Sequence, residues 1–181
     1  MRTLRTGSAH GATCSDIVAN PMEPRTIRLT APCSLRHRAL AVRLVAEACR
    51  LVRGERPGDD LAPGFDVRDP FDVAVVSAFA EIYNNVALHA CAGLVAPQIE
   101  LAIAATADGI VVEMTDPGRR FDPETVRSPD LDALPEGGMG LHIARAMLDA
   151  VDYEPGPPNL WRLSKRRVAV VDPPVVATRT A

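Results

Sequence analysis

The stretch Phe79-Ala80-Glu81-Ile82-Tyr83-Asn84-Asn85-Val86-Ala87-Leu88-His89-Ala90 lies at the centre of the predicted fold. It predicts the middle and end of a helix in which Glu81, Asn85 and His89 recur every four residues. Each step of four advances about 6 Å and drifts by only about 40° around the axis, so the three side chains form one polar stripe. Apolar residues fall on the broadly opposite arc, namely Val75, Val76, Phe79, Ile82, Val86 and Ala90. The helix therefore presents an apolar face to a core and a narrow polar line to something else.

The polar stripe carries groups with a defined chemistry. A carboxylate such as that of Glu81 can act as a general base toward a hydroxyl or a water. The amide oxygen of Asn85, one turn further on, is a hard neutral ligand of the kind that Mg²⁺ combines with waters and substrate phosphates. A polar stripe is also the ordinary outer face of a surface helix, so the stripe alone leaves both interpretations open.

The composition predicts one domain with flanking segments. The chain has 181 residues, of which 47% are hydrophobic and 4% aromatic, so an aliphatic core is expected. The net charge of −3 argues against nucleic-acid binding through phosphate neutralisation. No run of 18 apolar residues and no signal-peptide pattern occurs, and the four cysteines lack C-x-x-C spacing. These features predict a cytoplasmic protein with reduced thiols and no association with a membrane.

The domain is expected over residues 25–167, between a flexible leader at 1–24 and a proline-broken tail at 168–181. An edge strand is predicted at 26–29, and a helix over 35–52 with Ser34 as its N-cap. That helix has a basic side, for which a partner surface stays open. Residues 55–69 are rich in Gly, Pro and Asp and predict a loop, after which Asp69-Pro70 predicts the start of the central helix.

A hairpin should follow the central helix. Residues 99–106 and 110–115 predict strands, and Asp108-Gly109 between them is a strong hairpin signal. The return strand ends in Asp116-Pro117-Gly118. An ionised carboxylate at Asp116 only accepts hydrogen bonds, so it can bind an exocyclic amine such as that of adenine. Gly118 would let the backbone approach a flat ligand, although an ordinary Asp-Pro-Gly turn is the alternative.

The last part of the chain adds a glycine cluster and two strands. Residues 121–136 are acidic and proline-punctuated, and Gly137-Gly138-Met139-Gly140 should then open an amphipathic helix. Its apolar residues are Leu141, Ile143, Ala144, Met147, Leu148 and Val151. Glycines at a helix N-terminus allow N–H groups to face a phosphate, although a tight turn is equally compatible. Short strands are expected at 152–154 and 159–163, with Trp161 in the core and residues 165–167 as a solvated basic cluster.

Taken together and in this order, the three motifs resemble the ATP-binding fold shared by gyrase, histidine kinases and mismatch-repair proteins, known as the Bergerat or GHKL fold. The match is closest to the bacterial anti-sigma-factor serine/threonine kinases and covers residues 25–167. Residues 81–89 resemble their N box, 115–123 their first glycine box and 137–151 their second. The resemblance implies an α+β, two-layer sandwich with a mixed, mostly antiparallel sheet and helices on one face.

The resemblance also implies ATP and Mg²⁺ as ligands, with a role for each matching residue. Glu81 would be the catalytic base that takes the proton from a substrate hydroxyl, and Asn85 would hold the Mg²⁺. Asp116 would bind the adenine amine, and Gly118 would let the base sit close. The second glycine box would contact the nucleotide through Gly138, Met139, Gly140 and Leu141. His89 belongs to the motif, and a structural role is expected for it.

In this family the phosphoryl acceptor is an anti-sigma-factor antagonist of the STAS type, the other client is a sigma factor, and homodimers are common. The chain departs from the pattern at Arg120, where a second small residue is frequent, and in its acidic expected lid. Two alternatives stay open. One is a nucleotide-dependent binding module without kinase turnover, which the acidic lid favours; the other is the stand-alone ATPase half of a histidine kinase.

Overall fold

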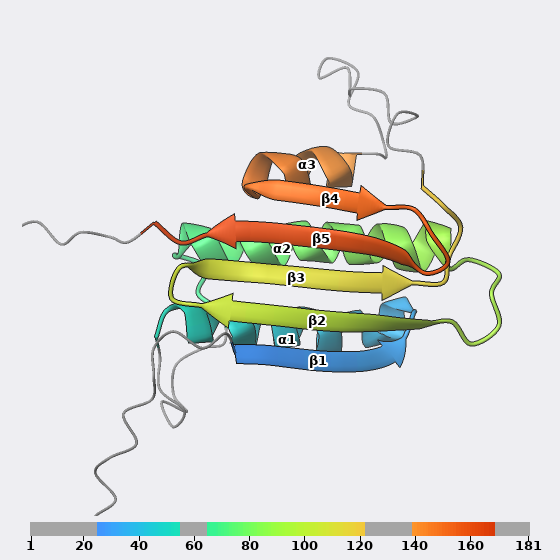
Figure 1. The fold of residues 1–181 in the computed structure, drawn as a ribbon, viewed down its shortest axis with the longest axis horizontal. Coiled ribbons are helices and arrows are strands. Elements are labelled where there is room, and N and C mark those ends of the chain that lie inside the picture. Colours follow the sequence, from blue (N-terminus) through green and yellow to red (C-terminus); the bar gives the residue numbers. More distant parts are fainter. Residues whose placement is uncertain (1–24, 55–64, 122–138, 169–181) are drawn as a thin grey trace, which may run out of the picture.

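The computed structural model describes residues 25–54, 65–121 and 139–168, which form one sheet with helices packed against it (Figure 1). Its elements are β1 (Arg25–Pro32), η1 (Leu35–His37), α1 (Arg38–Val52), α2 (Pro70–Asn85), η2 (Val86–Ala90), β2 (Gln98–Thr106), β3 (Gly109–Asp116), α3 (Met139–Met147), β4 (Ala150–Glu154) and β5 (Asn159–Arg166). In Figure 1, α1 and α2 lie behind the sheet and α3 lies along β4. The predicted α+β, two-layer architecture is confirmed.

The sheet has five strands in the order β1-β2-β3-β5-β4, and all four pairings between these described strands are antiparallel. β1 lies at an edge, as predicted, and β2 and β3 form the predicted hairpin, with Thr106 opposite Gly109. A Cβ on Gly109 would lie 2.3 Å from the Lys165 carbonyl oxygen, so only glycine fits this turn. The strand pair near the C-terminus is confirmed as β4 and β5.

One face of the sheet supplies the core. Alternate residues of β2, β3 and β5 are buried against the helices, because successive side chains of a strand point to opposite faces. The apolar members of this set are Ile99, Leu101, Ile103, Ala105, Ile110, Val112, Met114, Trp161 and Leu163. Two polar residues, Asp116 and Asn159, occupy the same buried face. They lie opposite each other at paired ends of β3 and β5, so the otherwise apolar buried face becomes polar at this end of the two strands.

The start of α2 follows the prediction, but its end does not. The Asp69 side chain accepts a hydrogen bond of 2.9 Å from the Phe71 N–H, so Asp69 is the N-cap. The α-helix stops at Asn85, and Val86–Ala90 form a wider π-helical turn. The Cys91 N–H closes it by donating to the Val86 carbonyl at 2.9 Å. The predicted stripe therefore keeps α-helical spacing only through Asn85, and the wider turn offsets His89 from it.

Two other predictions of helix ends are wrong. The helix predicted from residue 35 begins with the 3₁₀ turn η1, and the Ser34 side chain does not cap it. The Ser34 hydroxyl instead lies 2.9 Å from Nδ1 of His37. Val151 was expected on the amphipathic helix, but α3 ends at Met147 and Val151 lies in β4 opposite Leu163. The apolar spacing near residues 147–151 fits a helix and a strand equally, and sheet pairing decides between them.

Buried charge anchors the first turn of α2. Asp72 is fully buried and accepts hydrogen bonds from the Arg53 guanidinium and, at 3.0 Å, from the Asp66 N–H. Arg53 and Asp66 stand on either side of residues 55–64 in the sequence, so Asp72 ties together the two points where that segment leaves the described fold. Breaking such a buried pair is costly, because it leaves an uncompensated charge.

The basic cluster at residues 165–167 was expected to be solvated. This holds for Arg166, whose side chain is 88% exposed, and is wrong for the partly buried Lys165 and Arg167. Lys165 Nζ donates to the Met147 carbonyl at 2.6 Å, Arg166 pairs with Asp149, and Arg167 donates to Asp69 at 2.9 Å. Burial of Asp69 raises the pKa of its carboxyl, but the hydrogen bonds from the Phe71 N–H and Arg167 outweigh this and lower the pKa below its ordinary value. The cluster therefore fastens the end of β5 to α2 and α3.

The continuous helix Pro70–Ala90 is long and apolar enough to cross a bilayer by length and composition alone. In this fold it is a core helix, with most of its residues buried against the sheet and its neighbours. Residues 1–24, 55–64, 122–138 and 169–181 lie outside the described part of the chain. The leader, the tail, most of the 55–69 loop and the acidic lid therefore stay predictions, as do the domain boundaries.

Candidate functional site

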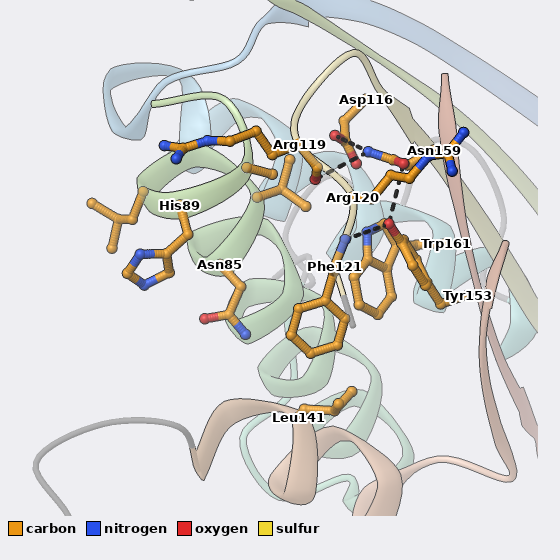
Figure 2. Close-up of a pocket in the computed structure, with 13 residues that line it drawn as sticks. Asn85, His89, Asp116, Arg119, Arg120, Phe121, Leu141, Tyr153, Asn159 and Trp161 are labelled. Carbon is orange, nitrogen blue, oxygen red and sulfur yellow. Dashed lines mark hydrogen bonds between the residues drawn. The ribbon is translucent and has the colours of Figure 1, made fainter. Parts of the chain in front are cut away.

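A cavity of about 500 Å³ lies between the end of α2, the loop after β3 and the strands β4 and β5 (Figure 2). One wall is helical and consists of Asn85, Val86, Leu88, His89 and Ala90. The loop after β3 supplies Asp116, Arg119, Arg120 and Phe121. The remaining lining residues are Leu141 from α3 and Tyr153, Asn159 and Trp161 from the sheet. A cavity of this size, mostly apolar with a few polar groups, is typical of a small-molecule site.

Asp116 is one of two buried polar residues in the lining of this cavity, together with Asn159. Asp116 is 1% exposed, and its Oδ1 accepts hydrogen bonds from the Gly118 N–H at 2.8 Å and from Asn159 Nδ2 at 3.0 Å. Its Oδ2 is buried and has no hydrogen-bond partner among the described residues. An unpaired buried acceptor is costly, so this oxygen is suited to a ligand that brings a donor. The exocyclic amine of adenine is such a donor.

Asn159 holds the loop that carries Asp116. Its Nδ2 donates to Asp116 Oδ1 and to the Gly118 carbonyl, both at 3.0 Å, and its Oδ1 accepts from the Tyr153 hydroxyl at 3.1 Å. The Tyr153 hydroxyl in turn accepts from the Phe121 N–H at 2.8 Å. Dashed lines in Figure 2 trace this chain of bonds from β5 to the loop. The network fixes the loop from Asp116 to Phe121 against the sheet.

Three aromatic rings form one side of the cavity. Tyr153 and Trp161 have ring centroids 4.5 Å apart, and Phe121 lies 5.8 Å from Tyr153 and 5.6 Å from Trp161. Trp161 was expected in the core, and at 4% exposure it is buried, but it also lines the cavity. The ring planes are tilted by 40° to 82° to one another, so the cluster is a rigid apolar wall against which a nucleobase could pack.

Two free cations stand at the rim. Arg119 and Arg120 are exposed, line the cavity, and have no side-chain hydrogen bond or ion pair with any described residue. Their backbone is fixed, since the Arg119 N–H donates to the Ala90 carbonyl at 2.9 Å. In Figure 2 the Arg119 and Arg120 side chains extend in different directions from the loop. The mouth of the cavity is therefore positive, which favours an anionic ligand.

The residues expected to handle phosphate meet at the contact between α2 and α3. A Cβ on Gly140 would lie 2.8 Å from Glu81 Oε2, 3.3 Å from the Glu81 Cβ and 3.4 Å from Asn85 Nδ2. Glycine at this position therefore lets the start of α3 approach the polar stripe. Asn85 and Leu141 line the cavity, whereas Glu81 lies one turn from Asn85 and is not part of the lining.

Glycine is required at position 118 for a structural reason that the sequence did not indicate. A Cβ there would lie 2.6 Å from the Ala90 carbonyl carbon and 2.7 Å from its oxygen. Glycine is thus required because the loop packs directly on the π turn η2, and Gly118 itself does not line the cavity. Its predicted contribution to base binding would be indirect, through the position of the loop.

The other predicted residues are only partly described. Gly138 and the acidic segment lie outside the described residues, and Met139 starts α3 with a side chain about which the structure says nothing. His89 is exposed and lines the cavity mouth. Within residues 25–54, 65–121 and 139–168, no three His, Cys, Asp or Glu side chains converge as a metal site. The role of Asn85 as a magnesium ligand stays a prediction.

Two thiols lie near Asp116. Burial raises the pKa of both Cys33 and Cys91, and the negative charge of Asp116 adds to the effect. Cys33 and Cys91 are hydrogen-bonded to each other. At neutral pH both thiols are therefore protonated, and within the described part of the chain neither forms a disulfide.

The sequence interpretation missed Asn159, Tyr153, Phe121 and Trp161 as site residues. Asn159 carried a signal: it stands in strand phase with Trp161 and Leu163, the buried positions of β5. A polar residue at a buried strand position needs partners, so it could have been recognised as part of a network. Nothing comparable marked Tyr153, because an aromatic residue is an ordinary strand component.

The comparison with known families agrees with this geometry. The family model described as the histidine kinase-like ATPase domain matches residues 25–164 of the chain. A search of curated proteins finds no match. The match spans both the helix that carries Glu81 and Asn85 and the β-strands around Asp116 and Asn159.

Proposed function

The chain belongs to the histidine kinase-like ATPase domain family, and on that premise we propose that it is an ATP-binding anti-sigma regulatory factor with serine/threonine protein kinase activity. The observation that supports ATP most directly is the unpaired Oδ2 of Asp116, buried in a cavity of about 500 Å³. The exocyclic amine of adenine can donate a hydrogen bond to this oxygen. Guanine has a carbonyl oxygen in place of that amine and cannot donate from this position. The proposed substrate of the kinase is an anti-sigma-factor antagonist of the STAS type.

The chain's residues fit ATP from its base to its phosphates. Asp116 would accept from the adenine amine, and the ring would lie near Phe121 and Trp161. Leu141 would border the nucleotide from α3. Met139 and Gly140 would place backbone N–H groups toward the phosphates, because they are the first residues of α3. The same role is proposed for Gly138, which lies outside the described residues. Arg119 at the rim adds positive charge.

Asn85 would hold Mg²⁺ through its side-chain oxygen. Magnesium, when bound, offsets the negative charge of the phosphates, which is the main requirement of phosphoryl transfer. The Asn85 side chain has no hydrogen bond with the described residues, so its amide oxygen is available.

Glu81 is the proposed general base. Its carboxylate would accept the proton of the serine or threonine hydroxyl while the oxygen of that hydroxyl takes the phosphoryl group. Contact with Gly140 keeps Glu81 next to the start of α3. Because Glu81 is outside the cavity lining, the acceptor hydroxyl would have to enter between α2 and the nucleotide.

Incubation with radiolabelled ATP, Mg²⁺ and a cognate antagonist tests the proposal. We expect label on the antagonist, and at least about a hundredfold slower transfer by the Glu81→Ala protein. Equal labelling of the antagonist by the wild-type and Glu81→Ala proteins, or no labelling by either, would refute the proposed kinase activity. ATP binding without transfer would favour the second candidate.

The second candidate is a nucleotide-dependent binding module without turnover. The position of Glu81 outside the cavity lining favours it. It predicts that ATP and ADP change the affinity for a partner while no phosphate moves, which calorimetry with each nucleotide would measure. A stand-alone ATPase half of a histidine kinase is also compatible with the family. That alternative predicts label on a partner histidine, which is acid-labile, rather than on serine or threonine.

The proposal extends to partners and location. We expect a sigma factor as the second client, a homodimer, and a cytoplasmic protein without nucleic-acid or membrane binding. The net charge of −3 supports the absence of direct DNA binding. A pull-down from the native cell with and without ATP would identify the partners.

A further inference from the structure

Asn159 has an unusually complete set of partners for one buried side chain. It is 1% exposed, and its Nδ2 donates to Asp116 Oδ1 and to the Gly118 carbonyl. Its Oδ1 accepts from the Tyr153 hydroxyl and from the Gly156 N–H, each at 3.1 Å. Both donor hydrogens and both acceptor positions of the amide are thus in use. Asn159 therefore has no group left with which to bind a ligand directly.

The partners also fix which way the amide points. A flipped amide would place its oxygen against the Asp116 carboxylate and the Gly118 carbonyl, all acceptors. It would also turn the NH₂ group toward the Gly156 N–H, a donor. Three of the four contacts would become repulsive, because only the Tyr153 hydroxyl can also accept a hydrogen bond, so the observed orientation is the favoured one.

This orientation determines what Asp116 can offer. Oδ1 is committed to Asn159 and to the Gly118 N–H, while Oδ2 is buried without a partner in the described chain. The carboxylate is thus held with one oxygen bound to the protein and one oxygen free. A mobile carboxylate would instead exchange its two oxygens and could satisfy itself within the loop.

We propose that Asn159 is a positioning residue that keeps the free oxygen of Asp116 aimed at a nucleobase amine and thereby sets the preference for bases that carry one. This inference rests on the proposed function, because it assumes that a purine nucleotide occupies the cavity. Asn159 acts through Asp116, because its own amide groups are in use and cannot hydrogen-bond the ligand. A ligand without the amine should consequently be insensitive to changes at residue 159 that leave the fold intact.

The test compares ATP with purine riboside triphosphate, which lacks only the amine. We expect the wild-type protein to prefer ATP by about ten- to a hundredfold, the range for a hydrogen bond to a charged group. In the Asn159→Asp protein at pH 8 this ratio should fall toward one, with the affinity for the analogue changed by less than about threefold. Gln98→Glu adds the same charge at an exposed position of β2 and should keep the wild-type ratio.

The pH dependence of the Asn159→Asp protein separates positioning from a structural role. The introduced carboxyl faces Asp116 and the Gly118 carbonyl, which raise its pKa in the folded state. Tyr153 donates to it, and the exposed Arg119 and Arg120 are the nearby cations. Below that raised pKa it is protonated and donates to Asp116 again, so the preference for ATP should return at pH 5.5 and disappear as the pH rises to 8. Thermal unfolding at both pH values monitors the fold.

The outcomes are distinct. A wild-type protein that binds neither nucleotide overturns both the proposed function and this inference. A wild-type preference for ATP that Asn159→Asp leaves unchanged at pH 8 overturns the inference alone. An equal loss of affinity for ATP and for the analogue, at both pH values, assigns Asn159 a merely structural role and also overturns it.

Discussion

Gly140→Ala should separate stability from catalysis in this fold. Gly140 is the second residue of α3, and its position without a Cβ allows α3 to approach α2. The added methyl group would lie 2.8 Å from Glu81 Oε2, which is closer than real Cβ contacts allow. Its distance to Asn85 Nδ2 would be 3.4 Å, which is a tolerable contact. The atom that must move is thus the end of a flexible side chain. We expect the Glu81 carboxylate to rotate away, and the 3.3 Å approach of the methyl group to the Glu81 Cβ to be relieved by a shift of a few tenths of an ångström between α2 and α3.

The expected free energies follow from this geometry. Alanine is favoured over glycine in a helix by up to about 1 kcal/mol, and less near a terminus. Rotating one carboxylate costs about the same amount. The two effects nearly cancel, so the midpoint of thermal unfolding should change by less than about 3 °C. Displacing a catalytic group by about 1 Å can cost a hundredfold in rate, and we expect a loss of this order in phosphoryl transfer.

The assay measures transfer to the antagonist, ATP affinity and thermal unfolding for Gly140→Ala, Glu81→Ala and the double variant. If the methyl group acts by displacing Glu81, the double variant should be no slower than Glu81→Ala alone. Gly54→Ala is the control: Gly54 has φ of +75° and open space around it, so alanine should lower stability and leave transfer unchanged. Additive losses in the double variant, or transfer by Gly140→Ala at the wild-type rate, would refute the reasoning.

Three further predictions concern the frame of the site. Gly118→Ala would place a Cβ 2.6 Å from backbone at Ala90, which cannot rotate away, so we expect a loss of about 2–3 kcal/mol in urea unfolding together with weaker ATP binding. Asp72→Asn breaks the buried pair with Arg53 and should cost about 3 kcal/mol by the same measurement, without changing ATP affinity once folded. The lowered pKa of Asp69 means that its ionised form stabilises the fold above its unfolded pKa and loses this effect as the pH falls through the folded value. The stability difference between wild type and Asp69→Asn should therefore shrink below about pH 4; a constant difference down to pH 2 would contradict it.

The sequence predicted those features that depend on short stretches of backbone. Asp69-Pro70 starts a helix because the cap is two residues from the N–H that it accepts, and Asp108-Gly109 makes a hairpin because both turn residues are adjacent. The aliphatic alternation of β2 and β3 likewise specified the buried face. In the site, Asn85, Asp116 and Leu141 line one cavity, and their roles stay proposals.

The features of the site that could not be predicted are made by contacts between distant parts of the chain. The apolar residues Ile82, Val86 and Ala90 fit an ordinary α-helix, and nothing local indicates the π turn. In the structure that turn brings the Ala90 carbonyl to the Arg119 N–H and packs Ala90 on Gly118. The pairing of Asp116 with Asn159 spans 43 residues and depends on the strand order, in which β5 lies next to β3.

The distribution of hydrogen bonds divides the site into two ends with different properties. At the end with Asp116, Asn159 and Tyr153, Asp116 Oδ2 is the one buried side-chain atom without a hydrogen-bond partner among the described residues, so the proposed base site is preorganised. At the other end, Glu81 and Asn85 make no side-chain hydrogen bond with the described residues and are held only by packing of α3 on α2. Preorganised groups bind at low entropic cost, whereas groups held by packing alone can be displaced by one methyl group. Affinity for the nucleotide should therefore depend on β3 and β5, and the rate of transfer on the contact between α2 and α3. If Gly140→Ala weakened ATP binding as strongly as it slowed transfer, this division would be wrong and the two ends would act as one unit.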